Sequence, residues 1–194
     1  MTDPNVLPPG PDTSPRTLLD TAAHIGTLVW LEQRAFEVLS AWSRDDADPE
    51  AQVLHATQAR HHAWRAEQLA ARFPTIADLA LDDRLAPPEP GLEALFDALT
   101  ALDGATTTDR LVATHRVLLP ELVAGHELDL ARATEVAEAP LRRTLRQVLT
   151  DEAADLAVGE AALQARLDAD PDVAAAAGAL VTRLTALLDG RRTA

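Results

Sequence analysis

The sequence contains no cysteine and no tyrosine among its 194 residues, and aromatic residues make up only 3% of it. The lack of cysteine excludes disulfide bonds, thiolate catalysis and cysteine-ligated zinc or iron–sulfur sites. The lack of tyrosine removes a common side chain for radical chemistry. Alanine and leucine are abundant, whereas β-branched residues do not gather into alternating runs, which favours helices over strands. The composition therefore predicts an all-α protein.

Basic residues and long apolar runs are also scarce. The chain has 17 Lys and Arg against 31 Asp and Glu, a net charge of −14, and its densest basic group is Arg142, Arg143 and Arg146. This charge repels nucleic-acid phosphates and anionic lipid head groups. No apolar run reaches the ~18 residues of a membrane span, and the first fifteen residues lack the basic and apolar regions of a secretory signal. We expect a cytoplasmic protein that binds neither nucleic acid nor a membrane.

The chain is expected to form one domain behind a short arm. Residues 1–15 contain five prolines and little apolar content, which predicts a flexible N-terminal arm. The remaining length suits a single helical-bundle domain over residues 16–190.

Apolar residues at three- and four-residue steps predict five helices within this domain. The first two span 16–44 and 49–73, and the next two span 108–135 and 141–167, with Pro120 expected to bend the third helix. Short turns make each pair antiparallel, and the proline-rich segment 74–108 forms a long crossover between the pairs. An additional C-terminal helix covers residues 171–189. This plan is a four-helix bundle with one long crossover.

Polar residues fall on the apolar faces of these helices. At 100° per residue, His62 points inward on the second helix while His61 lies towards an edge, and we favour His62 as the inward member of the pair. The third helix places His126 in its apolar stripe. The fourth places Glu152 there, with Asp155 beside it. Two further inward histidines, His55 and His115, are interpreted as hydrogen-bonded core residues.

The loop positions set the depth of these residues. Glu32 lies about a dozen residues before the first turn and His62 about a dozen after it, while His126 and Glu152 bracket the second turn almost as symmetrically. The four side chains should therefore converge near the middle of the bundle. Imidazole and carboxylate together suit iron, manganese or zinc. The predicted metal ligands are Glu32, His62, His126 and Glu152, with His61 and Asp155 as second choices, and the alternative is a metal-free polar network.

The segment TDEAADLAVGEAAL, Thr150 to Leu163, resembles the last helix of the ferritin-like superfamily, whose pattern is D-E-x-x-H-x-x-x-G-E. Glu152 and Gly159 match this pattern, whereas Asp155 stands at the histidine position. In the second helix, Gln58 stands at the family's glutamate position if His61 is the matching histidine, and Ala59 does so if His62 is. The resemblance implies a bundle with a central metal site. The missing carboxylates imply that di-iron catalysis is absent.

These patterns leave three hypotheses for the function. The first is a divergent ferritin-like bundle without di-iron catalysis that acts through binding or assembly. The second is a metal-dependent oxidoreductase with a reduced Glu/His ligand set. The third is a bundle that binds a small apolar ligand beside the alanines of its second helix. The sequence leaves enzymatic activity undecided. The last helix has an apolar face that either closes the flank of the bundle or forms a homodimer contact, made of Val173, Ala177, Leu180, Leu184, Leu187 and Leu188.

Overall fold

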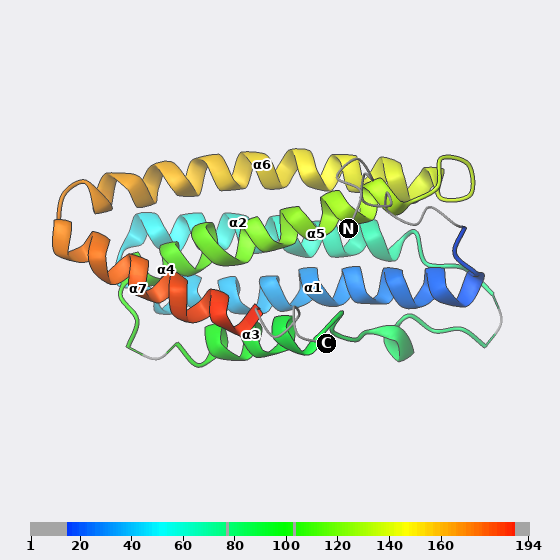
Figure 1. Cartoon of the computed structure of the whole chain (residues 1–194), viewed down its shortest axis with the longest axis horizontal. Helices are drawn as coiled ribbons and strands as arrows, with labels where there is room; N and C mark the ends of the chain where they lie inside the picture. The colour runs from blue at the N-terminus through cyan, green and yellow to red at the C-terminus, as the bar shows by residue number, and fades with distance from the viewer. Residues whose placement is uncertain (1–14, 77, 103, 189–194) are drawn as a thin grey trace, which may run out of the picture.

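A computed structural model of the chain describes residues 15–76, 78–102 and 104–188, and every regular element within these ranges is helical (Figure 1). The all-α prediction is therefore confirmed for the described part of the chain. The predicted arm lies outside these ranges, apart from Pro15. None of the described helices combines the length and apolar character that crossing a membrane requires. The elements in chain order are α1 (Leu18–Asp45), α2 (Pro49–Ala70), the short 3₁₀ turn η1 (Asp82–Arg84), α3 (Pro90–Thr100), α4 (Thr107–Val112), the π-helical segment η2 (Ala113–Leu118), α5 (Leu119–Arg132), α6 (Ala139–Leu167) and α7 (Pro171–Leu188).

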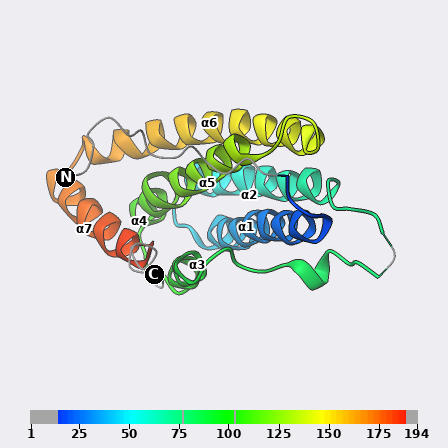
Figure 2. The same cartoon turned by 45° about the vertical axis from the view of Figure 1, so that its right-hand side comes forward.

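Helices α1 and α2 form the first antiparallel hairpin and lie side by side along their length (Figures 1 and 2). Thr17 begins α1 with a capping box, because its side chain accepts a hydrogen bond from the Asp20 backbone while Asp20 accepts one from Thr17. Asp48 caps α2, and Pro49 occupies the first turn, where a missing N–H costs nothing. The cap and the proline at the start of α2 explain why the short turn before it is well defined by the sequence.

The third long helix is continuous but irregular, since α4, η2 and α5 follow one another without a break. A capping box at Thr106 and Asp109 begins it, so the helix starts at Thr107, one residue before the predicted start at residue 108. Within η2 the backbone widens to a π turn, and the Leu119 N–H donates to Thr114 O, five residues back. Pro120 follows this turn directly. The π turn thus lies where proline removes a backbone donor, the position at which the sequence predicted a bend.

The crossover joins the two hairpins and packs against α1. At Gly26 of α1, an added Cβ would lie 2.2 Å from the carbonyl oxygen of Arg84 in η1, so only glycine allows this approach. Helix α3 then contributes Leu92, Leu95, Phe96 and Leu99 to the core. The predicted crossover is therefore also part of the hydrophobic core.

Helix α7 returns from the end of α6 to pack against α3, α4 and η2 (Figure 2). Its buried residues Ala177, Leu180, Leu184 and Leu188 belong to the same hydrophobic cluster as the buried residues of α3. The apolar face predicted for this helix is therefore covered within the chain. Of the two alternatives for this face, closure of the bundle flank is the one that the structure shows.

Gly159 of α6 allows a close contact with His115 of η2. An added Cβ at Gly159 would lie 1.7 Å from His115 Nε2. The imidazole is fixed, because its Nδ1 lies 2.9 Å from Leu111 O and its Nε2 lies 3.2 Å from Gln58 Oε1. His115 is thus a hydrogen-bonded core residue, as predicted.

Replacement of this glycine should disrupt the contact. Gly159→Ala is expected to lower the free energy of unfolding by about 1–3 kcal/mol, the usual cost of overpacking a core. The matched control is Gly125→Ala in α5, where no described atom lies within 4 Å of the added Cβ. That variant should gain about 0.5–1 kcal/mol from helix propensity alone. Urea unfolding followed by circular dichroism measures both, and equal stability changes would contradict the proposed contact.

Candidate metal centre

Three ligand-type side chains from three helices meet in the interior. Glu32 comes from the middle of α1, His126 from α5 and Glu152 from α6, and their relative exposures are 0%, 1% and 0%. Each offers one ligand atom, and these atoms all lie within 4.8 Å of one another. The depth predicted from the loop positions is therefore correct for these three residues.

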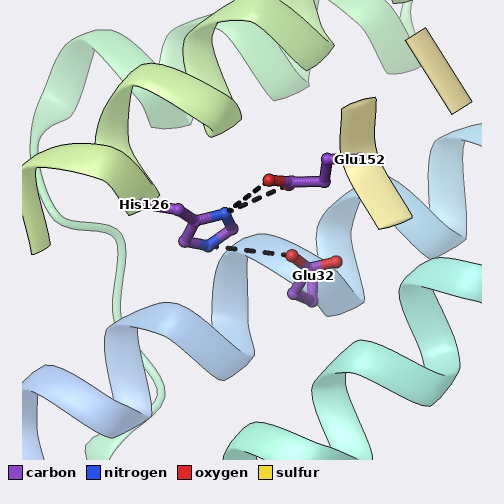
Figure 3. A group of neighbouring side chains, drawn as sticks. All are labelled: Glu32, His126 and Glu152. Carbon is purple, nitrogen blue, oxygen red and sulfur yellow. Dashed lines mark hydrogen bonds and ion pairs between the residues drawn. The ribbon is translucent and has the colours of Figure 1, made fainter. Parts of the chain in front are cut away.

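The imidazole of His126 lies between the two carboxylates (Figure 3). Its Nδ1 is 3.1 Å from both oxygens of Glu152, and its Nε2 is 3.8 Å from Glu32 Oε1. One histidine thus links a carboxylate of the first hairpin to a carboxylate of the second. Glu32, His126 and Glu152 therefore lie at the interface between the two hairpins.

His62 of α2 joins this group through Glu32. Its Nδ1 lies 2.6 Å from Glu32 Oε2, and the residue is fully buried. His61 is partly exposed, so His62 is the inward member of the pair, as predicted. All four predicted residues are therefore neighbours. His62, however, stands behind Glu32 and orients its carboxylate, whereas the other three form the compact set.

Burial and charge act in opposite directions on this group. Burial alone raises the pKa of the Glu32 carboxyl, but the positive charge and hydrogen bond of His62, with help from His126 and Arg65, lower this pKa below its ordinary value. Burial likewise lowers the pKa of His126, yet Glu152 and Glu32 outweigh it and raise the pKa to about 9. Glu32 is therefore ionised and His126 is protonated at neutral pH.

Three atoms of the group lack a hydrogen-bond partner in the described part of the protein: Glu32 Oε1, His62 Nε2 and His126 Nε2. Buried polar atoms are nearly always hydrogen-bonded, so three exceptions within one cluster require an explanation. Carboxylate oxygen and imidazole nitrogen are the donors that first-row transition ions bind. Two of the three unpaired atoms, Glu32 Oε1 and His126 Nε2, belong to the compact set, and their chemistry fits a metal ion.

The second-choice residues form a separate pair beside this group. His61 Nδ1 lies 2.8 Å from Asp155 Oδ1, and Arg65 donates to the other oxygen of Asp155. Arg65 is fully buried, and its Nη1 approaches His62 Nδ1 to 3.3 Å. Arg65 was not among the residues predicted for this site. The signal was its spacing, three residues after His62 and on the same face of α2.

The side chain of Gln58 in α2 also makes hydrogen bonds within the protein. Its Nε2 donates to Asp155 O at 3.0 Å, and its side chain contacts His115 Nε2. Asp155 stands where the ferritin-like pattern has histidine, and Gln58 stands at its glutamate position if His61 rather than His62 is the matching histidine. Neither keeps a donor set suited to a second metal ion, because one is a neutral amide and the other is paired with a guanidinium.

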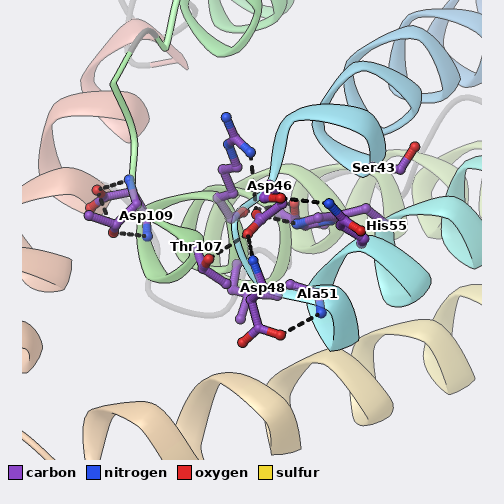
Figure 4. Close-up of polar contacts among 12 residues, drawn as sticks. Ser43, Asp46, Asp48, Ala51, His55, Thr107 and Asp109 are labelled. Carbon is purple, nitrogen blue, oxygen red and sulfur yellow. Dashed lines mark hydrogen bonds and ion pairs between the residues drawn. The ribbon is translucent and has the colours of Figure 1, made fainter.

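A second buried polar cluster ties the α1–α2 loop to the start of the third long helix (Figure 4). Asp46 accepts hydrogen bonds from Thr107 and from the Asp48 backbone, and Arg110 Nη1 lies 3.4 Å from its Oδ2. His55 Nε2 is 3.7 Å from the same oxygen, too far for a hydrogen bond. The interpretation of His55 as a hydrogen-bonded core residue was therefore wrong. Neither of its ring nitrogens has a hydrogen-bond partner among the described residues.

No family model matches the sequence, and comparisons with curated proteins and with solved structures give no significant match.

His55 should make the protein sensitive to acid. Burial lowers its pKa to about 4, below the 6.5 of an exposed histidine, so the folded state resists a proton that the unfolded chain accepts. Its contribution is complete above pH 6.5 and is lost as the pH falls towards 4. The loss amounts to about 3 kcal/mol, since each pKa unit corresponds to about 1.4 kcal/mol.

The His55→Gln variant, which does not titrate, should lose about 3 kcal/mol less stability between pH 7 and pH 4 than the unaltered protein. Urea unfolding at several pH values measures this difference. Parallel pH profiles for the two proteins would show that His55 is not the acid-sensitive group.

Proposed function

We propose that this chain is a divergent ferritin-like helical bundle that binds one divalent transition-metal ion, with iron, manganese and zinc as the candidates. Glu32, His126 and Glu152 hold the ion, and His62 positions Glu32. One observation carries the proposal. Three buried ligand atoms lie within 4.8 Å of one another, and two buried atoms of these residues, Glu32 Oε1 and His126 Nε2, have no hydrogen-bond partner in the described chain.

The arrangement of the helices supports the ferritin-like assignment. The hairpin of α1 and α2 is joined by a long connection to a second hairpin made by the α4–α5 helix and α6. The ligand residues come from α1, α5 and α6, as expected for a bundle whose metal site lies between its two hairpins. Gly159, the other residue of the matching pattern, packs against His115 close to Gln58.

Charge balance is compatible with one divalent ion at this place. Glu32 and Glu152 bring two negative charges into an apolar interior, where unpaired charges are costly. A divalent ion neutralises both carboxylates and leaves His126 neutral. The nearby Asp155 is already neutralised by Arg65. Each part of the core is then electrically balanced without residues from outside it.

The same residues argue against a dinuclear site. Two ions a few Å apart need bridging carboxylates, and the buried guanidinium of Arg65 would repel a second cation beside Asp155. The proposal therefore excludes the usual di-iron chemistry. A single redox-active ion would leave room for the second hypothesis, a metal-dependent oxidoreductase.

A metal-free network is the competing candidate, and it too has a specific observation behind it. His62 and His126 already contact Glu32 and Glu152 at hydrogen-bond distance. In that case the four residues would hold the hairpins together, and the protein would act through binding or assembly. Metal content separates the two candidates.

The protein purified without chelator and without a histidine tag should bind one equivalent of Mn²⁺, Fe²⁺ or Zn²⁺ per chain. Glu152→Gln should weaken this binding by at least about 100-fold, because it removes a ligand rather than an outer-shell partner. Elemental analysis and calorimetric titration measure both values. The matched control is Glu160→Gln, which alters an exposed carboxylate of the same helix and should bind metal normally.

Two equivalents per chain would contradict the mononuclear proposal. Absence of binding by the unaltered protein, including after anaerobic incubation with Fe²⁺, would leave the metal-free network as the function of these residues.

His62 should affect metal binding indirectly. His62→Gln leaves the three ligands in place but removes the imidazole that holds Glu32 Oε2, so we expect metal affinity to fall by about 10–100-fold. The Glu152→Gln variant should lose more. Calorimetric titration of both variants gives the order, and equal losses would place His62 among the ligands themselves.

A further inference from the structure

A cleft of about 320 Å³ connects the surface with one residue of the proposed metal site. It lies between α1, the segment that precedes α3, and α5. Of the three ligand residues, only His126 lines it. His126 is 1% exposed, and its Nε2 has no hydrogen-bond partner in the described residues. The inner end of the cleft is therefore the buried imidazole of His126, whose Nδ1 contacts Glu152 and whose Nε2 has no hydrogen-bond partner among the described residues.

The charge of the lining favours a cation. Three carboxylates line the cleft, those of Glu89, Glu121 and Asp129, against the guanidinium of Arg132 and the protonated imidazole of His126 at the inner end. His24 also lines it, and burial lowers the pKa of this imidazole despite the proximity of Asp129, so it adds no positive charge at neutral pH. The lining therefore carries a net negative charge, which attracts cations.

The cleft on the other side of the bundle has a different chemistry. It lies between α2 and α6 and is lined by Arg60, His61 and Asp155, among others. The buried guanidinium of Arg65 binds Asp155. A cation that entered from this side would meet two arginine side chains before it reached Glu32. The cleft at His126 is therefore the more favourable approach.

Gly125 keeps the approach to His126 open. It is an exposed residue in the middle of α5 that lines the cleft, and no described atom lies within 4 Å of the position of an added Cβ. Packing thus gives no reason for glycine, which destabilises a helix interior relative to alanine. A larger side chain at this position would narrow the cleft.

We propose that this cleft is the entry path by which a hydrated divalent cation reaches the site formed by Glu32, His126 and Glu152. The inference rests on the proposed function, since it supplies the route for the ion that those residues bind. The carboxylates attract the ion, His126 receives it at the inner end, and the absence of a side chain at Gly125 leaves the passage wide enough.

The test is the rate of Co²⁺ binding, followed by stopped-flow measurement of its visible absorption. Gly125→Leu should slow association and dissociation by the same factor, about tenfold, and leave the equilibrium affinity unchanged, because an obstructed path alters rates only. The matched control is Ala124→Leu, which places the same side chain on the neighbouring exposed position outside the cleft. That variant should bind at the rate of the unaltered protein.

The charge of the lining is tested separately. Glu121→Gln should slow association by about threefold at low ionic strength and by less at high salt, because electrostatic steering is screened. Glu127→Gln, on the same helix but outside the cleft, should not change the rate.

The outcomes distinguish the two proposals. Failure of the unaltered protein to bind Co²⁺ overturns the proposed function and the entry path together. Normal affinity with an unchanged rate in both Gly125→Leu and Glu121→Gln overturns the entry path alone. Circular dichroism shows whether each variant is folded. If Gly125→Leu does not fold, the association rate of Glu121→Gln decides the test.

Discussion

The ionised carboxylate of Glu32 in the middle of an apolar bundle is the constraint on which the rest of the core depends. A fully buried charge is costly unless opposite charge and hydrogen bonds compensate it. His62 contacts one oxygen at 2.6 Å, and His126 lies 3.8 Å from the other. His126 in turn carries its proton because Glu152 contacts it from α6. One buried carboxylate thus fixes side chains on three other helical segments, and these contacts set the register of the two hairpins.

Arg65 belongs to a second buried charge pair in the neighbouring layer of the core. A buried guanidinium needs a carboxylate, and Asp155 supplies it from α6. Gln58 and His115 complete this layer by hydrogen bonds, and Gly159 leaves the space for the imidazole. Gln58 and Asp155 therefore make contacts within the protein and are not available as ligands of a second ion. Among the residues that the structure describes, one potential cation site therefore remains in the core.

Helical periodicity predicted much of this arrangement because the hairpins are regular. Equal distances from a short turn place Glu32 opposite His62 and His126 opposite Glu152, and no tertiary information is needed for that step. Periodicity could not separate the compact ligand set from His62, because a difference of a few Å depends on rotamers and on the approach of the helices. It also gave no indication of the π turn beyond Pro120 itself. The commitment of Asp155 to Arg65 was not predictable either, since several arginines were equally placed by sequence alone.

The central claim is that Glu32, His126 and Glu152 hold one metal ion. The most direct test is anomalous diffraction from crystals of the unaltered protein grown with Mn²⁺ or Zn²⁺, with data collected on both sides of the absorption edge of that metal. The account predicts one anomalous peak within bonding distance of all three side chains, with His62 still in contact with Glu32. A core without a peak, in which the contacts of His126 and His62 with the two carboxylates are intact, would contradict it.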